Sequence, residues 1–470
     1  MSALALMAPL RLADVVAGTA GRLLAGSPAS DREIAGVSID SRTLQPGQLF
    51  VAIAGPRFDG HAFLEEAAAK GAAAAVVHRD VAAPASLPLV RVADTTRALQ
   101  DLARHRRLDA DLPVVAVTGS VGKTTTKDMT AALLATRGPV LKTEGNLNNQ
   151  YGLPLSLLRL KPEHTAAVLE LGMSAAGELR ELSAIAQPDV AVITRVSAVH
   201  LEFFESLDAI AAAKAEILEG LRPGGAAVLN GDDERLRRIG ERFAGRVVWF
   251  GRDRGFEVSA EGWRGTGFGM RFFLRIDGRN VDVALPLPGP HFVTNFLAAA
   301  AAAHALGISS EAMAAAATHL HAARHRGEVT RLGEGVVLLD DCYNSSPDAL
   351  EAALVALSLL PGRRHIAVLG DMLELGPAAA VLHRDGGRSL AGRVDAVLAV
   401  GALAGELLEG AREAGLPASA LQAAADADSA ARAVPTLVEP GDAVLVKGSR
   451  GVHLEKVVDA LLDRFRAGKA

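Results

Sequence analysis

The sequence has little cysteine, few aromatic residues and no excess of basic charge, and each shortage narrows the class of protein. Cys342 is the single cysteine, so no disulfide can form within the chain and a reducing compartment is expected. The formal net charge is -5 at pH 7, which offers none of the basic surface that nucleic-acid binding requires. We therefore expect no nucleic-acid partner.

Long hydrophobic runs are missing as well. No window holds the roughly 20 uninterrupted apolar residues of a membrane helix. The segment from Met1 to Leu12 lacks the basic start and the long apolar stretch of a signal peptide. The sequence thus predicts a cytoplasmic protein without membrane insertion, and we expect a monomer.

The chain is too long for one core, and three regions with different patterns of apolar and turn-forming residues follow one another. Residues 1–92 mix short apolar runs with turn signals, residues 93–321 alternate apolar strands with helical stretches, and residues 322–470 repeat that alternation. Continuous apolar strands between helices indicate parallel sheets that are covered on both faces. The sequence predicts an α/β protein of three domains with these boundaries, the last one Rossmann-like.

Apolar runs and turn signals place the main elements of the second and third regions. Helices are expected at Lys123 to Arg137 and at Asn295 to Leu306, and an antiparallel extension at Phe256 to Pro288. The expected buried strands are Pro113 to Thr118, Ala166 to Leu171, Asp189 to Thr194, Val336 to Leu339, Ile366 to Leu369, Ala396 to Val400 and Ala443 to Val446.

The strongest motif runs from Thr118 to Thr126 and reads Thr-Gly-Ser-Val-Gly-Lys-Thr-Thr-Thr. It follows an apolar strand and opens a helix, so backbone N–H groups and the helix dipole can bind phosphate. Lys123 is expected against the terminal phosphates and the Thr124 hydroxyl on Mg²⁺. Val117 stands where the common motif has a glycine, so the loop is a shortened variant. The predicted ATP-binding residues here are Gly119, Ser120, Val121, Gly122, Lys123, Thr124 and Thr125.

Three further residues are weak signals when each is taken alone. Glu170 ends an apolar strand, where ligands collect in parallel sheets and where a carboxylate suits Mg²⁺. A glutamate in an ordinary turn explains it equally well. His200 alone would be a structural histidine, and Lys214, in a helix, would be a solvated lysine.

These motifs together resemble the Mur ligase superfamily, and the resemblance covers nearly the whole chain. The shortened loop ending in Gly-Lys-Thr-Thr carries it. The run from Thr143 to Pro154 looks like the branch that adds D-alanyl-D-alanine to UDP-N-acetylmuramoyl-tripeptide. The resemblance implies a ligase of peptidoglycan synthesis that uses ATP and forms an acyl phosphate. It also implies that Asn148 and Asn149 bind the substrate.

The same resemblance implies functional roles for the three residues that are weak signals when each is taken alone. It implies that Thr124, Glu170, His200 and Lys214 bind magnesium, as two ions, with Lys214 carbamylated. A carbamate turns a cation into a carboxylate-like ligand, and two divalent ions would offset the charge of the phosphates. Lys123, Lys214 and His200 are the implied catalytic residues.

Other segments resemble the nucleotide-binding and acceptor-binding parts of the family. His291 and Asn295 are similar to the residues on either side of its adenine-contacting asparagine, which Phe292 replaces. The run from Asp340 to Pro347 is similar to its Asp-Asp-Ser-Tyr-Asn-Ala-Asn-Pro signature, with Cys342, Ser345 and Ser346 departing from it. The implied roles are ATP binding for His291, Asn295, Arg326, Asp341 and Asn344, contact with the acceptor dipeptide for Lys447, Ser449 and Arg450, and contact with the uridine nucleotide for Ser41 and Arg42.

Alternatives stay open at this point. Another ligase of the superfamily, or an ATP-binding regulator that has lost ligation, would share much of the pattern. A GTPase is disfavoured because the sequence has no Asn-Lys-x-Asp segment. His319, His321 and His325 are spaced as metal ligands can be, but no cysteine or carboxylate frames them, so surface histidines are expected.

Overall fold

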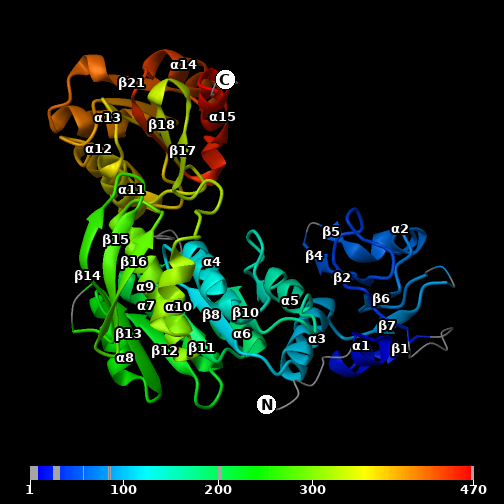
Figure 1. Ribbon diagram of the computed structural model, residues 1–470. Helices are drawn as coiled ribbons and strands as arrows, with labels where there is room; N and C mark the ends of the chain where they lie inside the picture. The colour runs from blue at the N-terminus through cyan, green and yellow to red at the C-terminus, as the bar shows by residue number, and fades with distance from the viewer. Residues whose placement is uncertain are drawn as a thin grey trace. The chain divides into compact units, whose positions relative to one another are not determined.

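The computed structural model describes residues 9–24, 32–56, 58–82, 84, 86–198, 204–252 and 255–466. Three main sheets with helices around them make up this part of the chain (Figure 1), which confirms the predicted α/β class. The chain divides into two compact units: residues 1–118, 137–192 and 213–227 form the first, and residues 119–136, 193–212 and 228–470 form the second. The domain boundaries near residues 92 and 321 remain predictions.

The first sheet uses the apolar runs before residue 92. Its order is β1-β7-β6-β3-β2, with β1 antiparallel to β7 and the other pairs parallel. Every residue of Leu49–Val51 (β3) and Ala74–Val77 (β6) is buried. The remaining elements of this segment are α1 (Leu12–Gly18), β1 (Arg22–Leu23), β2 (Val37–Ser38), β4 (Ala54–Gly55), β5 (Phe58–Asp59), α2 (Leu64–Ala69) and β7 (Leu89–Arg91).

The second sheet has nine strands in the order β16-β15-β14-β13-β12-β11-β8-β10-β9. Strand β10 runs parallel to both β8 and β9, and the strands β14 to β16 pair antiparallel, as the sequence predicted. The bounds are β8 (Val114–Thr118), β9 (Val140–Lys142), β10 (Ala166–Glu170), β11 (Val190–Ile193), β12 (Ala226–Asn230), β13 (Arg246–Gly251), β14 (Val258–Gly265), β15 (Met270–Ile276) and β16 (Arg279–Leu285).

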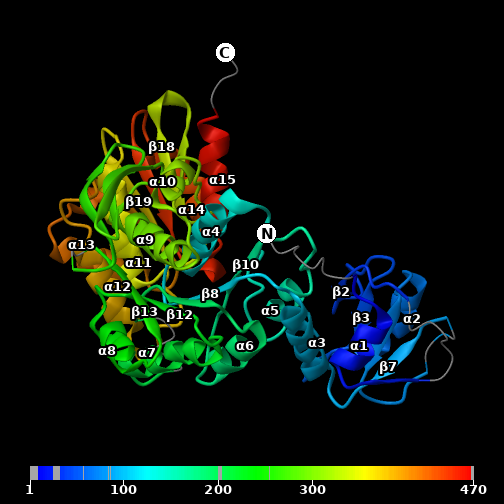
Figure 2. The same ribbon diagram turned by 60° about the horizontal axis from the view of Figure 1, so that its bottom comes forward.

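Helices of this region follow the strands in alternation, and α9 packs against β13 and β14 (Figures 1 and 2). Helix α9 begins at Pro290, not at Asn295, because proline suits the first helical position and Gly289 turns the chain with φ 115°. The helices are α3 (Thr95–Asp109), α4 (Lys123–Leu134), α5 (Gly152–Leu157), α6 (Glu178–Ala186), α7 (Leu207–Ala215), α8 (Glu234–Arg242), α9 (Pro290–Ala305) and α10 (Ser310–Ala317).

The third sheet has six strands in the order β17-β18-β22-β19-β20-β21, parallel except for β17. Its elements are β17 (Glu328–Arg331), β18 (Val337–Asp341), α11 (Pro347–Leu359), β19 (His365–Gly370), α12 (Ala379–Arg388), β20 (Ala396–Val400), α13 (Ala404–Glu413), β21 (Leu421–Ala424), α14 (Ala427–Leu437), β22 (Ala443–Lys447) and α15 (Glu455–Arg464).

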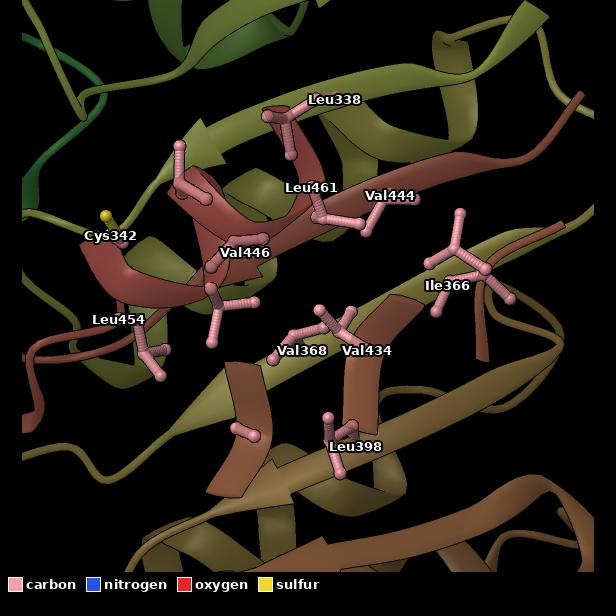
Figure 3. Packing of buried hydrophobic residues seen from close by; sticks show 14 of the residues in the cluster. Leu338, Cys342, Ile366, Val368, Leu398, Val434, Val444, Val446, Leu454 and Leu461 are labelled. Carbon is pink, nitrogen blue, oxygen red and sulfur yellow. The ribbon is translucent and has the colours of Figure 1, made fainter. Parts of the chain in front are cut away.

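Successive residues of β18 belong to different cores. Leu338 lies near Leu461 and Val444 in a cluster that also includes Val434 of α14 (Figure 3). Leu339 belongs to a second cluster with residues of α11 and α13. Both faces of this sheet are therefore buried, which is why its strands read as unbroken apolar runs. None of the helices in the described residues has the length and apolarity that crossing a membrane needs.

Candidate active site

The phosphate loop lies between β8, whose five residues are all buried, and the first turn of α4. Gly119 has φ 151° and Gly122 has φ 82°. A Cβ on Gly119 would lie 1.9 Å from Thr194 Oγ1, and one on Gly122 would lie 2.4 Å from Asn295 Oδ1. Neither position can hold a side chain, so the two glycines fix the course of the loop.

Hydrogen bonds hold the loop against the segment that follows β11. Ser120 N–H donates to Arg195 O at 2.8 Å, and Thr194 Oγ1 donates to Val121 O at 2.6 Å. Lys123 Nζ donates to Gly119 O at 2.7 Å and to Ser120 O at 3.2 Å, so the ammonium lies over the loop. This arrangement has the backbone and the cation that a triphosphate needs.

Two residues that were predicted to bind the nucleotide, His291 and Asn295, lie on one face of helix α9. Asn295 reaches Gly122 at the start of α4, because the two helices pack side by side. His291 lies one turn earlier on α9. Burial, helped by the charge of Lys447 and opposed by that of Asp341, lowers the pKa of His291 to about 4. The imidazole is neutral at pH 7, and its buried Nδ1 makes no hydrogen bond to any described residue.

Glu170 ends β10 in register with Val117 of β8, two residues before Gly119. Its side chain is 3% exposed, and Asn148 Nδ2 donates to Glu170 Oε1 at 2.9 Å. An ordinary exposed turn is thus excluded for Glu170. Asn149 has a local partner as well, because its Oδ1 accepts from the N–H groups of Tyr151 and Gly152 at the start of α5.

Lys214 lies on α7 and is 2% exposed, which excludes the solvated lysine that its sequence position suggests when taken alone. A lysine is almost never buried unless a partner or a modification compensates its charge. His200, the other predicted ligand from this part of the sequence, lies outside the described residues.

Four charged side chains and one tyrosine lie near the ends of strands β18 and β22. They are here called the strand-end cluster, which is made of Arg326, Asp341, Tyr343, Lys447 and Arg450. Lys447 Nζ lies 2.6 Å from Asp341 Oδ2 and 3.0 Å from Asn344 O, since the two strand-end residues pair in register. Lys447 is 2% exposed. The predicted acceptor ligand Lys447 is therefore engaged in an ion pair in which the lysine is buried and the carboxylate is partly exposed.

Tyr343 is the residue of this cluster for which no role was predicted from the sequence. The guanidinium of Arg326 lies 3.7 Å from the centre of its ring, and Arg450 Nη1 donates to its hydroxyl at 3.1 Å. Ser449 Oγ accepts from Leu373 N–H at 2.9 Å, which ties the Arg450 loop to the end of β19. Tyr343 therefore contacts the guanidinium groups of both arginines.

Two predicted substrate residues, Ser41 and Arg42, lie in the turn between β2 and β3. Ser41 Oγ donates to Glu66 at 3.0 Å, and Arg42 pairs with Asp40 at 2.7 Å. The hydrogen bond and charge of Arg42 hold the pKa of Asp40 at about 2. The Arg42 side chain is 84% exposed, so its guanidinium can still meet an anionic group from solvent.

Three family models match the chain in succession. They are described as Mur ligase family, catalytic domain, over residues 33–107; Mur ligase middle domain, over residues 117–303; and Mur ligase, glutamate ligase domain, over residues 325–450. Together they span the three sheets in the order that the sequence predicts.

The chain is similar over nearly its whole length to two curated relatives, each named UDP-N-acetylmuramoyl-tripeptide–D-alanyl-D-alanine ligase. The relative from Escherichia coli (strain K12) is 38% identical over 92% of this chain and 94% of its own. The relative from Bacillus subtilis (strain 168) is 36% identical over 96% and 97%.

Two solved structures are also similar to this chain over nearly its whole length. MurF from Acinetobacter baumannii superposes with a TM-score of 0.89 at 34% identity, over 97% of this chain and 100% of that one. MurF ligase from Thermotoga maritima in complex with ADP superposes with a TM-score of 0.80 at 31% identity, over 91% of this chain and 97% of that one.

Proposed function

The chain belongs to the Mur ligase family, and on that premise we propose that it joins D-alanyl-D-alanine to UDP-N-acetylmuramoyl-tripeptide. It is an ATP-dependent peptide ligase of peptidoglycan synthesis. The observation that carries this choice of substrates is that relatives of this name match more than nine-tenths of both chains.

The reaction has two steps. A carboxylate oxygen of the tripeptide attacks the γ-phosphorus of ATP, so that ADP leaves and an acyl phosphate forms. The amine nitrogen of D-alanyl-D-alanine then attacks the acyl carbon, phosphate leaves with the electrons of the C–O bond, and the amine releases a proton. Little side-chain proton chemistry is needed, so the protein contributes mainly positioning and electrostatics.

The phosphate loop supports the first step. Lys123 Nζ donates to two carbonyl oxygens of the loop. With ATP bound, we expect a rotation of its side chain to exchange these partners for phosphate oxygens. There it offsets the negative charge that builds on the transferred phosphoryl group. Arg326 and Arg450, held on Tyr343, provide cationic groups for the nucleotide and for the acceptor carboxylate respectively.

The residues assigned to magnesium fit that ion. Glu170 offers a buried carboxylate that Asn148 orients, and Thr124 offers a hydroxyl at the start of α4. Lys214 fits only as a carbamate, because a buried ammonium would repel a cation. We propose these three residues, together with His200, as the ligands. Bound magnesium would offset the charge of the phosphates.

Phosphate release tests the proposal. The protein is mixed with ATP and Mg²⁺, with the UDP-linked tripeptide and D-alanyl-D-alanine each added or withheld. Release that needs both, with a pentapeptide product by mass, supports the assignment. Phosphate release that requires a different amine would support a ligase with another acceptor substrate. ATP binding without phosphate release under any pairing would contradict ligase activity.

The setting of the reaction follows from the same proposal. ATP and a UDP-linked precursor are both cytoplasmic compounds, so we place the enzyme in the cytoplasm. We expect it to act as a monomer, which light scattering of the purified chain would check.

A further inference from the structure

A cluster of three metal-ligating side chains lies in the third sheet, outside the roles assigned above. His325 precedes β17, Asp340 belongs to β18, and Cys342 follows it. Their donor atoms all lie within 4.8 Å of one another. The sequence argument that no cysteine or carboxylate frames the histidines was wrong for His325, because β17 and β18 pair antiparallel and bring the three side chains together. His319 and His321 are exposed, as expected.

The distances between the three donor atoms are close to those of a tetrahedrally coordinated cation. His325 Nδ1 lies 2.7 Å from Asp340 Oδ2 and 3.6 Å from Cys342 Sγ. Zinc bonds of about 2.0–2.3 Å at tetrahedral angles require donor separations of about 3.4–3.6 Å. The sulfur and nitrogen already meet this requirement. The nitrogen and oxygen must move apart by less than about 1 Å, as a cation replaces the proton between them.

A nucleophilic triad is excluded by the same geometry. In a triad the thiol and the carboxylate contact different ring nitrogens of the histidine. Here Cys342 Sγ and Asp340 Oδ2 both face Nδ1 of His325. Burial, with the charge of Asp340, also raises the pKa of the Cys342 thiol far above its usual range. Without a cation beside it, Cys342 is therefore an unreactive thiol.

The surroundings favour a cation. Asp340 and Cys342 are buried, at 4% and 3% exposed, and Cys342 stands at one end of the hydrophobic cluster in Figure 3. Glu455 and Asp341 act on the thiol with further negative charge. The charged groups with the largest effect on Cys342 are carboxylates. Sulfur and imidazole donors select zinc over magnesium.

We propose that His325 Nδ1, Asp340 Oδ2 and Cys342 Sγ form a binding site for a thiophilic divalent cation, of which Zn²⁺ is the representative, with water as the fourth ligand. The site is distinct from the magnesium ligands, none of which offers sulfur. It joins the segment before β17 to the end of β18, next to Arg326 and Asp341 of the strand-end cluster.

Cobalt and zinc titrations of the metal-stripped full chain, without ATP, test the proposal. Co²⁺ should give a thiolate charge-transfer band at one equivalent, and Zn²⁺ should abolish it. Cys342→Ser should remove the band and weaken Zn²⁺ binding by about 100-fold or more. His321→Gln, an exposed neighbour, should change neither.

Binding of Co²⁺ without a thiolate band, or a Zn²⁺ affinity that Cys342→Ser leaves unchanged, would overturn the site. Serine is the residue of the family signature at this position, so the variant should keep its fold, which circular dichroism checks. His325→Gln provides a second test that retains the thiol. It should weaken Zn²⁺ binding by a similar factor, and an unchanged affinity would again count against the site.

Discussion

The phosphate loop and the strand-end cluster bind charge by different means. In the loop, backbone groups and two glycines set the geometry, and one lysine adds charge. In the strand-end cluster, side chains from separate strands set it: Lys447 reaches Asp341 across 106 residues of sequence. The loop is thus specified by nine consecutive residues, whereas the cluster exists only once the order of the third sheet is known.

This difference predicts how each region responds to substitution. A backbone-built site should fail when a side chain is added, even a methyl group. A side-chain-built site should fail when one partner of a pair is removed, and it should recover when both partners are removed together.

The largest effect is expected for Gly119→Ala. The new Cβ would lie 1.9 Å from Thr194 Oγ1, which is itself fixed on Val121 O, so the loop must shift away from its phosphate-binding shape. Loss of the loop's aligned donors should lower kcat/KM for ATP by about 100-fold or more. Steady-state phosphate release measures it.

Gly224→Ala is the matched control for this effect. Gly224 also has a positive φ, of 82°, but a Cβ there meets nothing within 4 Å. Alanine at Gly224 meets the strain of the left-handed region, about 1–2 kcal/mol, without the clash. Activity that falls equally in both variants would show that strain, not the shape of the loop, limits catalysis.

A smaller effect is expected when the buried ion pair is broken. Asp341→Asn leaves the ammonium of Lys447, which is 2% exposed, without its carboxylate. Removing one partner of a buried pair should lower the free energy of unfolding by about 3 kcal/mol. Lys447→Met should cost less, because the Asp341 side chain is 24% exposed and water can solvate it. Denaturant unfolding compares the two variants.

The double variant Asp341→Asn with Lys447→Met tests whether the two residues stabilise the fold as a pair or independently. Recovery of most of the lost stability is expected, since no buried charge then remains unpaired. Strictly additive losses would mean that the two residues stabilise the sheet separately, and the comparison with the loop would no longer hold.

Much of the fold could be predicted because each element carries a local signal. Unbroken apolar runs marked the parallel strands, and Ser346 caps α11 with Pro347 behind it, as the sequence indicated. The start of α9 was placed too late because the helical pattern at Asn295 is stronger than the turn at Gly289. Helix ends depend on such single positions, so they are harder to predict than the elements themselves.

The positions of the phosphate-loop residues could be predicted because a single segment of sequence forms the loop. Gly119, Gly122 and Lys123 lie in the loop as expected. The position of Tyr343 between two arginines, and that of His325 beside Asp340, depend on strand pairing that no local pattern encodes. An aromatic residue two positions after Asp341, in the run from Asp340 to Pro347, was the one available signal for Tyr343.

The smallest effect concerns His291, which links the two regions, since it shares a helix face with Asn295 and its pKa responds to Asp341 and Lys447. Its folded pKa of about 4 lies below the ordinary histidine value of 6.5, so the unfolded chain takes up the proton first as the pH falls. Stability from His291 is complete above pH 6.5 and is lost as pH falls toward 4. At pH 5 the loss should be about 1–2 kcal/mol, and His291→Gln should remove it. Thermal midpoints of both proteins from pH 7.5 to 4.5 measure this, and two curves that stay parallel throughout would show that His291 titrates as it does in the unfolded chain.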